Sequence, residues 1–107
     1  PEGYWTRSLL DPEHAPGPET SGTAFFTYGL LWGMNNGFLD KATYQPVVEK
    51  AWKYLTTVAL QPDGRIGYVQ PIGEKAIPGQ VVDANSTANF GVGAFLLAAC
   101  EMVRFLD

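Results

Sequence analysis

Cysteine and histidine are nearly absent from this chain, which has one of each among its 107 residues. Cys100 cannot form an internal disulfide and lies in an apolar run, so we expect a small core residue rather than a nucleophile. His14 lies in a Pro-rich loop, where we expect a solvated side chain rather than a positioned general base. The sequence has no CxxC or HxxE spacing, so we expect no metal site.

Charge is also sparse, because only 17% of the residues are charged and the formal net charge is −4. Lys and Arg form no cluster, which argues against a nucleic-acid surface. No signal peptide or lipidation motif is visible, and we expect no stretch to span a membrane. The chain begins at Pro1, and its sequence alone predicts no compartment.

Apolar residues make up 46% of the chain, enough for one folded domain over residues 1–107. The first predicted helix follows cap candidates at 18–21 and ends at Gly37, a residue suited to a left-handed turn. Its apolar residues lie on every side, which is typical of a helix surrounded by protein. Trp32 lies in this helix and is expected to be mostly core.

Two more helices are predicted. The second begins at Asp40 or Thr43 and runs to Ala59, with Pro46 expected in its first turn. Its single apolar stripe, which includes Trp52, indicates a surface helix with one buried side. A short strand or extended arm is expected at 66–70, then a loop to about Val82. The third helix is predicted to begin near 85–87 and to run to Leu106, so the fold class is all-α.

A repeated pattern organises these elements. The segment TAFFTYG at 23–29 matches TANFGVG at 87–93, and Pro1-Glu2-Gly3 matches Pro62-Asp63-Gly64 at a similar offset. We interpret this as a helical hairpin repeated about one and three-quarter times, with chance similarity as the alternative. Because such hairpins need neighbours, we predict inner helices lining a ring or solenoid and striped helices outside.

Longer stretches carry a family resemblance. They read WTRSLLDPEHAPGPETSGTAFFTYGLLWGMNNGFLD, YQPVVEKAWKYL, PDGRIGYVQPIG and FGVGAFLLAACEM. They resemble the C-terminal part of glycoside hydrolase families 105 and 88, the unsaturated rhamnogalacturonyl and glucuronyl hydrolases. The resemblance covers nearly the whole chain, and PETSGTAFFTYGLLWG with GYVQPIG is fairly specific to family 105. It implies part of an (α/α)6 toroid, with residues 1–107 supplying its closing hairpins.

The resemblance also implies a reaction. Family members hydrate the double bond of the unsaturated uronic acid left by a polysaccharide lyase. The hydrated product is a hemiketal that opens and releases the adjoining sugar, without a metal or organic cofactor. The family's proton-donating Asp, its partner Asp, a His and a Trp-Ala-Arg-Gly-Asn motif belong to upstream hairpins, and none of these motifs occurs here. The resemblance therefore implies no catalytic residue in this chain and no activity for it alone.

The predicted substrate contacts precede the two inner helices. They are Glu19, Thr20 and Ser21 in the first copy, Asp83, Asn85 and Ser86 in the second, and Trp5 on the preceding arm. Helix N-termini favour carboxylates, and the implied substrate carries one. Capping is the simpler interpretation of the first six residues, and both roles can hold together. Trp5, like its counterpart Tyr68, is a candidate for stacking on a sugar ring.

The implied partners are an unsaturated uronic-acid oligosaccharide from pectin and the upstream hairpins of the same enzyme, in the cytoplasm or periplasm of a bacterium. Two exposed inner helices would also make the isolated chain self-associate. A second hypothesis is a non-catalytic helical-hairpin module for assembly or carbohydrate binding. Its sign would be an exposed aromatic row, for which Tyr4, Trp5 and Tyr68 are the candidates.

Overall fold

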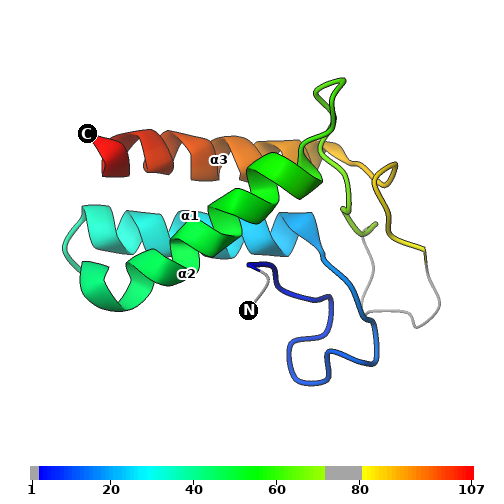
Figure 1. Ribbon diagram of the computed structural model, residues 1–107, viewed down its shortest axis with the longest axis horizontal. Helices are drawn as coiled ribbons and strands as arrows, with labels where there is room; N and C mark the ends of the chain where they lie inside the picture. The colour runs from blue at the N-terminus through cyan, green and yellow to red at the C-terminus, as the bar shows by residue number, and fades with distance from the viewer. Residues whose placement is uncertain (1–2, 72–80) are drawn as a thin grey trace.

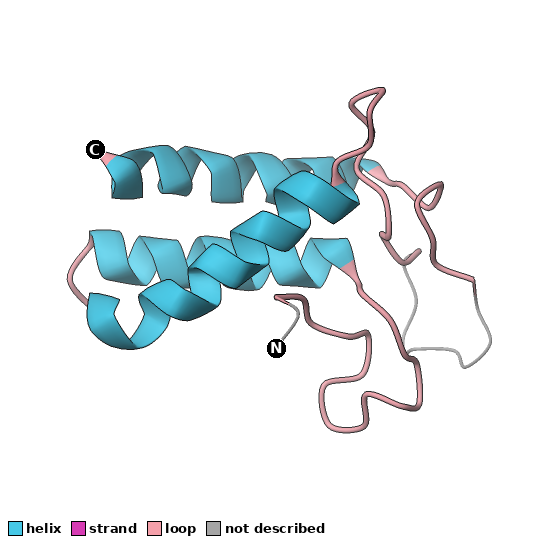
Figure 2. Cartoon of the chain, viewed as in Figure 1, coloured by secondary structure: helices cyan, strands magenta, loops and turns pink. Residues whose placement is uncertain are grey.

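The computed structural model describes residues 3–71 and 81–107, which form three α-helices and connecting loops (Figure 1). Helix α1 spans Thr20–Asn35, α2 spans Lys41–Tyr54 and continues as a π-helical turn over Leu55–Ala59, and α3 spans Asn89–Leu106. Figure 2 shows no strand in the described part of the chain. The all-α prediction is confirmed, and residues 66–70 form the extended arm rather than a strand.

Helices α1 and α3 lie side by side and run in the same direction, while α2 crosses α1 in a second layer (Figure 1). In the described part of the chain, long loops gather at the end where α1 and α3 begin, and the short turn between α1 and α2 lies at the opposite end (Figure 2). This arrangement matches the predicted order of inner and outer helices. The predicted loop up to Val82 lies partly outside the described residues.

The turn between α1 and α2 follows directly from local sequence chemistry. The Phe38 amide bonds the Gly33 carbonyl and the Gly37 amide bonds the Met34 carbonyl, which is the Schellman pattern. Gly37 has φ +80°, as predicted for a left-handed position. Asp40 then caps α2 by accepting from the amide and hydroxyl of Thr43, and these bonds lower the pKa of the Asp40 carboxyl. Two local signals thus fix the hairpin.

Pro46 is the sixth residue of α2 and not part of its first turn as expected, because Asp40 rather than Thr43 caps the helix. A proline there leaves the Ala42 carbonyl without an intrahelical donor. At its other end α2 widens into a π-turn, where the Leu60 amide bonds the Leu55 carbonyl. The predicted end at Ala59 is confirmed.

The core lies between the two layers. One buried cluster forms near the starts of α1 and α3, where Tyr54, Leu55 and Ile66 meet Ala24 and Ala94. A second cluster lies toward the other end and consists of Leu31, Met34, Val48 and Met102. Trp52 of α2 packs against both clusters and stacks on Phe95 of α3, with 5.8 Å between ring centroids.

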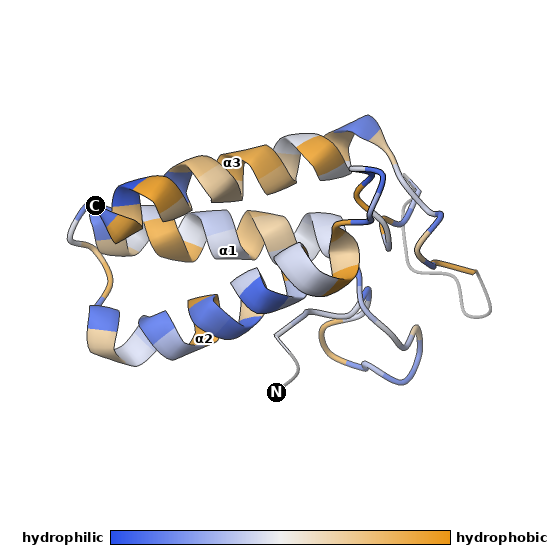
Figure 3. Cartoon of the chain, turned by 45° about the horizontal axis from the view of Figure 1, so that its top comes forward, coloured by the Kyte–Doolittle hydropathy of each residue, from blue (hydrophilic) through white to orange (hydrophobic). Residues whose placement is uncertain are grey.

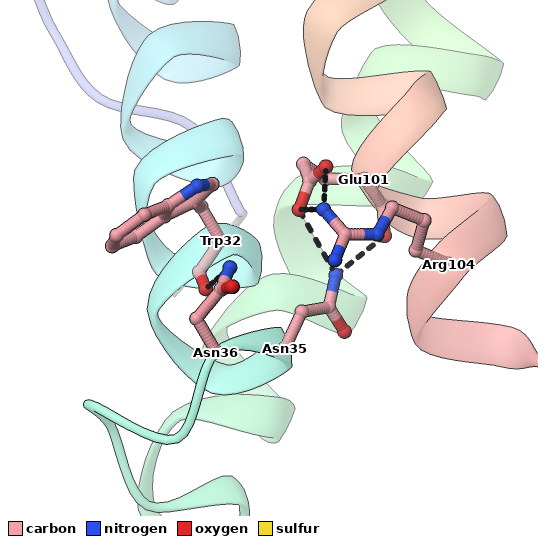
Figure 4. A network of polar contacts seen from close by, with 5 residues as sticks. All are labelled: Trp32, Asn35, Asn36, Glu101 and Arg104. Atoms are coloured by element: carbon pink, nitrogen blue, oxygen red, sulfur yellow. Dashed lines mark hydrogen bonds and ion pairs between the residues drawn. The ribbon is translucent and has the colours of Figure 1, made fainter.

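The far ends of α1 and α3 are joined by polar contacts (Figure 4). The Asn35 amide nitrogen donates to the Glu101 carbonyl at 2.9 Å and to its carboxylate at 3.2 Å. Glu101 is buried and also bonds Arg104, one turn later on α3, at 3.1 Å. The carboxylate is therefore paired and hydrogen-bonded, as a buried charge requires.

Much apolar surface of α1 and α3 is uncovered in this chain, and Figure 3 shows hydrophobic residues along the length of α3. The exposed side chains are Phe25, Phe26 and Trp32 on α1 and Val92, Leu96, Leu97, Val103 and Leu106 on α3. Cys100 is exposed as well. The core placements expected for Trp32 and Cys100 are wrong within the described chain, because both side chains lie on exposed faces of their helices, and Trp32 stacks on the exposed ring of Phe38.

By length and composition α3 could cross a membrane. The sequence had predicted no stretch of this kind. Its 18 residues have a mean hydropathy of 1.4, and 28% of them are buried. Core helices of soluble proteins meet the same criteria. The length and hydropathy of α3 are therefore only weak evidence for a membrane helix.

Candidate functional site

The start of α1 is closed by the carboxylate of Glu19, which is 4% exposed. One oxygen accepts from the Gly22 amide at 2.7 Å, and the other accepts from the Ser21 amide at 3.1 Å. The Ser21 hydroxyl donates to both oxygens. Glu19 is therefore the N-cap, and its negative charge occupies the place where the helix dipole favours an anion.

Thr20 adds a second anchor at the same point. Its amide donates to the Tyr68 carbonyl at 2.8 Å, and its hydroxyl donates to the Gly67 carbonyl at 2.6 Å. The Thr20 hydroxyl has one proton, which it donates to Gly67. In the 2.8 Å hydrogen bond between Thr20 and Tyr54, the Tyr54 phenol is therefore the donor and the Thr20 oxygen the acceptor. Burial of Tyr54 raises the pKa of its phenol. Glu19, Thr20 and Ser21 are thus buried and bonded within the chain, as the capping interpretation requires.

The extended segment 66–70 connects the two helix starts. The Gln70 amide donates to the Glu19 carboxylate at 3.0 Å, while the Tyr68 and Val69 amides donate to the carbonyls of Asp83 and Ser86. Because segment 66–70 forms hydrogen bonds both with the beginning of α1 and with the loop before α3, these three parts of the chain form one edge. We call this edge, made of residues 19–21, 66–70 and 83–86, the rim.

Asp83, Asn85 and Ser86 form a small turn on the rim and do not begin a helix. The Ser86 amide donates to the Asp83 carbonyl at 2.9 Å, and the Asn85 amide donates to the Asp83 carboxylate at 2.9 Å. Asp83 and Asn85 are exposed. Helix α3 begins only at Asn89, so the predicted start near 85–87 is wrong, because the side chains of Asp83 and Ser86 bond the turn instead.

The start of α3 differs from that of α1. Its N-cap is Ala88, and no side chain among the described residues caps it. The two matched segments are therefore not equivalent residue by residue, because Thr23 lies inside α1 whereas Thr87 precedes α3. Among the described residues, a side chain thus caps the start of α1, and none caps the start of α3.

Trp5 lies beside the rim on the loop that precedes α1. Its amide donates to the Thr23 hydroxyl at 2.9 Å, and its ring packs on Phe26 with 5.0 Å between centroids. With Tyr4 it borders a cleft of about 630 Å³ between residues 3–17 and α2. The volume suits a small ligand, so Trp5 stays a candidate for contact with sugar.

The loop before α1 carries further ionisable side chains outside the rim. His14, Asp11 and Glu13 are exposed on the loop before α1, and the His14 amide bonds the Asp11 carbonyl. No three His, Cys, Asp or Glu residues within 3–71 and 81–107 are grouped as a metal site would need.

Sequence reasoning missed how central residues 66–70 are, as well as the role of Tyr54. Residues 66–70 were expected to be an arm, yet their amides tie together the two segments of the rim. Gly67 is a signal for this, because a Cβ there would lie 2.5 Å from the Ala84 carbonyl oxygen. A glycine inside an extended run marks such a close backbone approach.

Comparison with known proteins supports a hydrolase family. Residues 1–106 match the sequence pattern of Glycosyl Hydrolase Family 88. A protein of Formosa agariphila named unsaturated 3S-rhamnoglycuronyl hydrolase is 47% identical, covering 96% of this chain and 26% of that protein. A protein of Alteromonas sp. with the same name is 45% identical, covering 95% of this chain and 24% of the relative. The chain spans about a quarter of the length of these curated relatives.

Two solved structures are similar over nearly the whole chain. A structure named polysaccharide lyase is 89% identical with a TM-score of 0.92, and 99% of this chain covers 30% of it. A glycosyl hydrolase family 88 structure from Bacteroides vulgatus is 78% identical with the same TM-score, and 98% of this chain covers 30% of it. The family pattern matches nearly every residue and agrees with the expected resemblance. The chain belongs to glycosyl hydrolase family 88.

Proposed function

We propose that this chain is part of an enzyme that hydrates the double bond of an unsaturated uronyl residue at the end of a lyase-generated oligosaccharide. A proton adds to one carbon of the double bond and water supplies hydroxide to the other. The resulting hemiketal opens and releases the adjoining sugar. The two curated relatives that carry the name unsaturated 3S-rhamnoglycuronyl hydrolase support this reaction class.

The observation that carries the proposal is the rim, where two parallel inner helices begin side by side. The first four amides of α1 are bonded within the chain. The start of α3 has no side-chain cap among the described residues, and exposed Asp83 and Asn85 lie on the turn before it. An uncapped helix start suits a substrate carboxylate, so substrate contact belongs mainly to the α3 side of the rim.

The residues of the rim divide into two roles under this proposal. Glu19, Thr20 and Ser21 position the rim from beneath, because they are buried. Asp83, Asn85 and Ser86 face the substrate, and Trp5 stacks on a sugar ring at the side. The acid that protonates the double bond lies in another part of the whole protein, so residues 1–107 alone do not turn over substrate.

The test measures ultraviolet absorbance while the full-length protein acts on an unsaturated galacturonyl disaccharide. The proposal predicts falling absorbance, because hydration removes the conjugated double bond. It also predicts no change with residues 1–107 alone. Constant absorbance with the full-length protein on unsaturated galacturonyl and glucuronyl disaccharides would contradict the reaction class.

A second candidate function is β-elimination, favoured by the name of the 89% identical structure. A lyase removes a proton beside the uronate carboxylate, expels the neighbouring sugar and leaves a new double bond. On a saturated polyuronide the same absorbance would then rise. The family match over residues 1–106 favours hydration, and the direction of the absorbance change separates the two reactions.

A further inference from the structure

Tyr68 has a backbone conformation that its side chain disfavours. Its φ of +63° is the one positive value at a non-glycine residue within 3–71 and 81–107. The left-handed region is crowded for a residue with a bulky side chain. Glycine would adopt the same conformation without that strain. The tyrosine side chain therefore serves something other than the local turn.

Hydrogen bonds on both sides fix this conformation. The Tyr68 amide donates to the Asp83 carbonyl at 2.8 Å, and the Tyr68 carbonyl accepts from the Thr20 amide at 2.8 Å. The next amide, that of Val69, donates to the Ser86 carbonyl at 2.9 Å. The base of the Tyr68 side chain is thus held between the two segments of the rim.

Within 3–71 and 81–107, neither buried cluster includes the side chain of Tyr68. Ile66 and Val69 are 3% and 2% exposed and belong to the buried cluster beneath the rim. Tyr68 is half-buried. It is not among the buried residues of that cluster, and it is not among the partly buried residues that pack against the cluster. A residue that is strained, fixed and not part of the core has the properties of a binding contact.

We propose that Tyr68 contacts the uronic-acid substrate directly and that its strained conformation is retained for this contact. This inference rests on the proposed function. A tyrosine offers an apolar ring face for a sugar ring and a hydroxyl for a sugar oxygen. Because its backbone is already fixed, little conformational freedom is lost when it binds.

The experiment compares Tyr68→Gly, Tyr68→Phe and the unchanged full-length protein. Tyr68→Gly relieves the strain and should raise the thermal midpoint, while binding of saturated digalacturonate, measured by calorimetry, weakens roughly tenfold. Tyr68→Phe should keep the ring contact and lose less affinity. Phe38→Ala, which removes an exposed aromatic ring at the opposite end of α1, is the control and should bind like the unchanged protein.

Equal digalacturonate affinity in Tyr68→Gly and the unchanged protein would overturn the inference, and so would absence of binding by the unchanged protein. A lower thermal midpoint in Tyr68→Gly with unchanged affinity would make Tyr68 a structural residue. Turnover is measured separately on the unsaturated disaccharide. If the proposed reaction is wrong, the unchanged protein shows no turnover. If the Tyr68 contact is wrong, Tyr68→Gly and the unchanged protein bind digalacturonate with equal affinity.

Discussion

The buried carboxylate of Glu19 joins two parts of the rim, the start of α1 and the segment 66–70. It accepts from the Ser21 and Gly22 amides at the start of α1 and from the Gln70 amide on the neighbouring segment. Bonds of this kind to a charged acceptor are stronger than neutral ones. Removing it would leave three buried or partly buried amides, and the Ser21 hydroxyl, without this acceptor.

Glu19→Ala is therefore expected to destabilise the full-length protein by about 2 kcal/mol. Glu19→Gln keeps one acceptor oxygen and should cost about half as much. Urea denaturation of the full-length protein measures both. A loss in Glu19→Ala no larger than that of an exposed substitution such as Glu49→Ala would contradict the capping role.

The buried phenol of Tyr54 makes stability depend on high pH. Burial raises its pKa above the ordinary value of 10.0, so the folded state keeps the proton where the unfolded state has lost it. The resulting stability is fully present below about pH 10 and is lost as the pH rises from there through the folded pKa.

Tyr54→Phe should remove this dependence. Above pH 10 the unchanged protein should lose stability more steeply than Tyr54→Phe, by up to about 1.4 kcal/mol per pH unit. Near neutral pH the variant should be less stable by about 1 kcal/mol, because the bond to Thr20 is lost. Denaturation midpoints from pH 8 to pH 11.5 test this, and parallel pH profiles would refute it.

At the scale of elements, the segment 66–70 packs so tightly against α3 that Gly91 has no room for a side chain. A Cβ at Gly91 would lie 2.5 Å from a methyl carbon of Val69, whereas a Cβ at Gly93 would meet nothing within 4 Å. The close contact between Gly91 and Val69 helps to place the rim beside the start of α3.

Gly91→Ala is expected to destabilise the protein by about 1–3 kcal/mol through overpacking, despite the better helix propensity of alanine. Val69→Ala makes room, so the double variant should lose less stability than the sum of the two single losses. A double-mutant cycle by urea denaturation measures this coupling. Additive losses would show that the contact is not tight.

The helices were predictable from sequence where local chemistry decides them. Glu19 and Gly37 are a cap and a left-handed turn residue at the ends of α1, and both were found as expected. The start of α3 was not predictable from local sequence. Asp83 and Ser86 look like residues that cap a helix, but they form hydrogen bonds with each other in a turn and do not cap α3. The rim depends on contacts between residues up to 51 positions apart, such as Glu19 with Gln70, which no local pattern encodes.

At the scale of the whole molecule, the chain is a partial (α/α) toroid that leaves apolar faces of its inner helices exposed. Leu96 on α3 is 57% exposed, and Phe25 on α1 is 48% exposed. Apolar patches of this kind are normally covered in soluble proteins. The predicted hairpin repeat would account for this exposure, because a hairpin relies on its neighbours to bury its inner helix.

The isolated polypeptide of residues 1–107 should therefore self-associate. Light scattering over rising protein concentration should show an increasing mean mass, and the change Leu96→Lys with Val103→Lys should reduce it. A matched change on the other side of the chain, Gln45→Lys in α2 with Thr57→Lys in the π-helical turn that follows it, should not reduce the mean mass. A constant monomer mass for the unchanged fragment would contradict the expectation.

We propose above all that the rim contacts the substrate, chiefly on the side of α3. The most direct measurement is kcat/KM of the full-length protein on the unsaturated disaccharide for Asp83→Asn and Asn85→Ala, beside Asp63→Asn. Asp63 is an exposed carboxylate paired with Arg65 in another turn. We expect a roughly tenfold or greater loss of kcat/KM for the two rim variants and an unchanged value for Asp63→Asn. Equal kcat/KM in all three variants and the unchanged protein would contradict it.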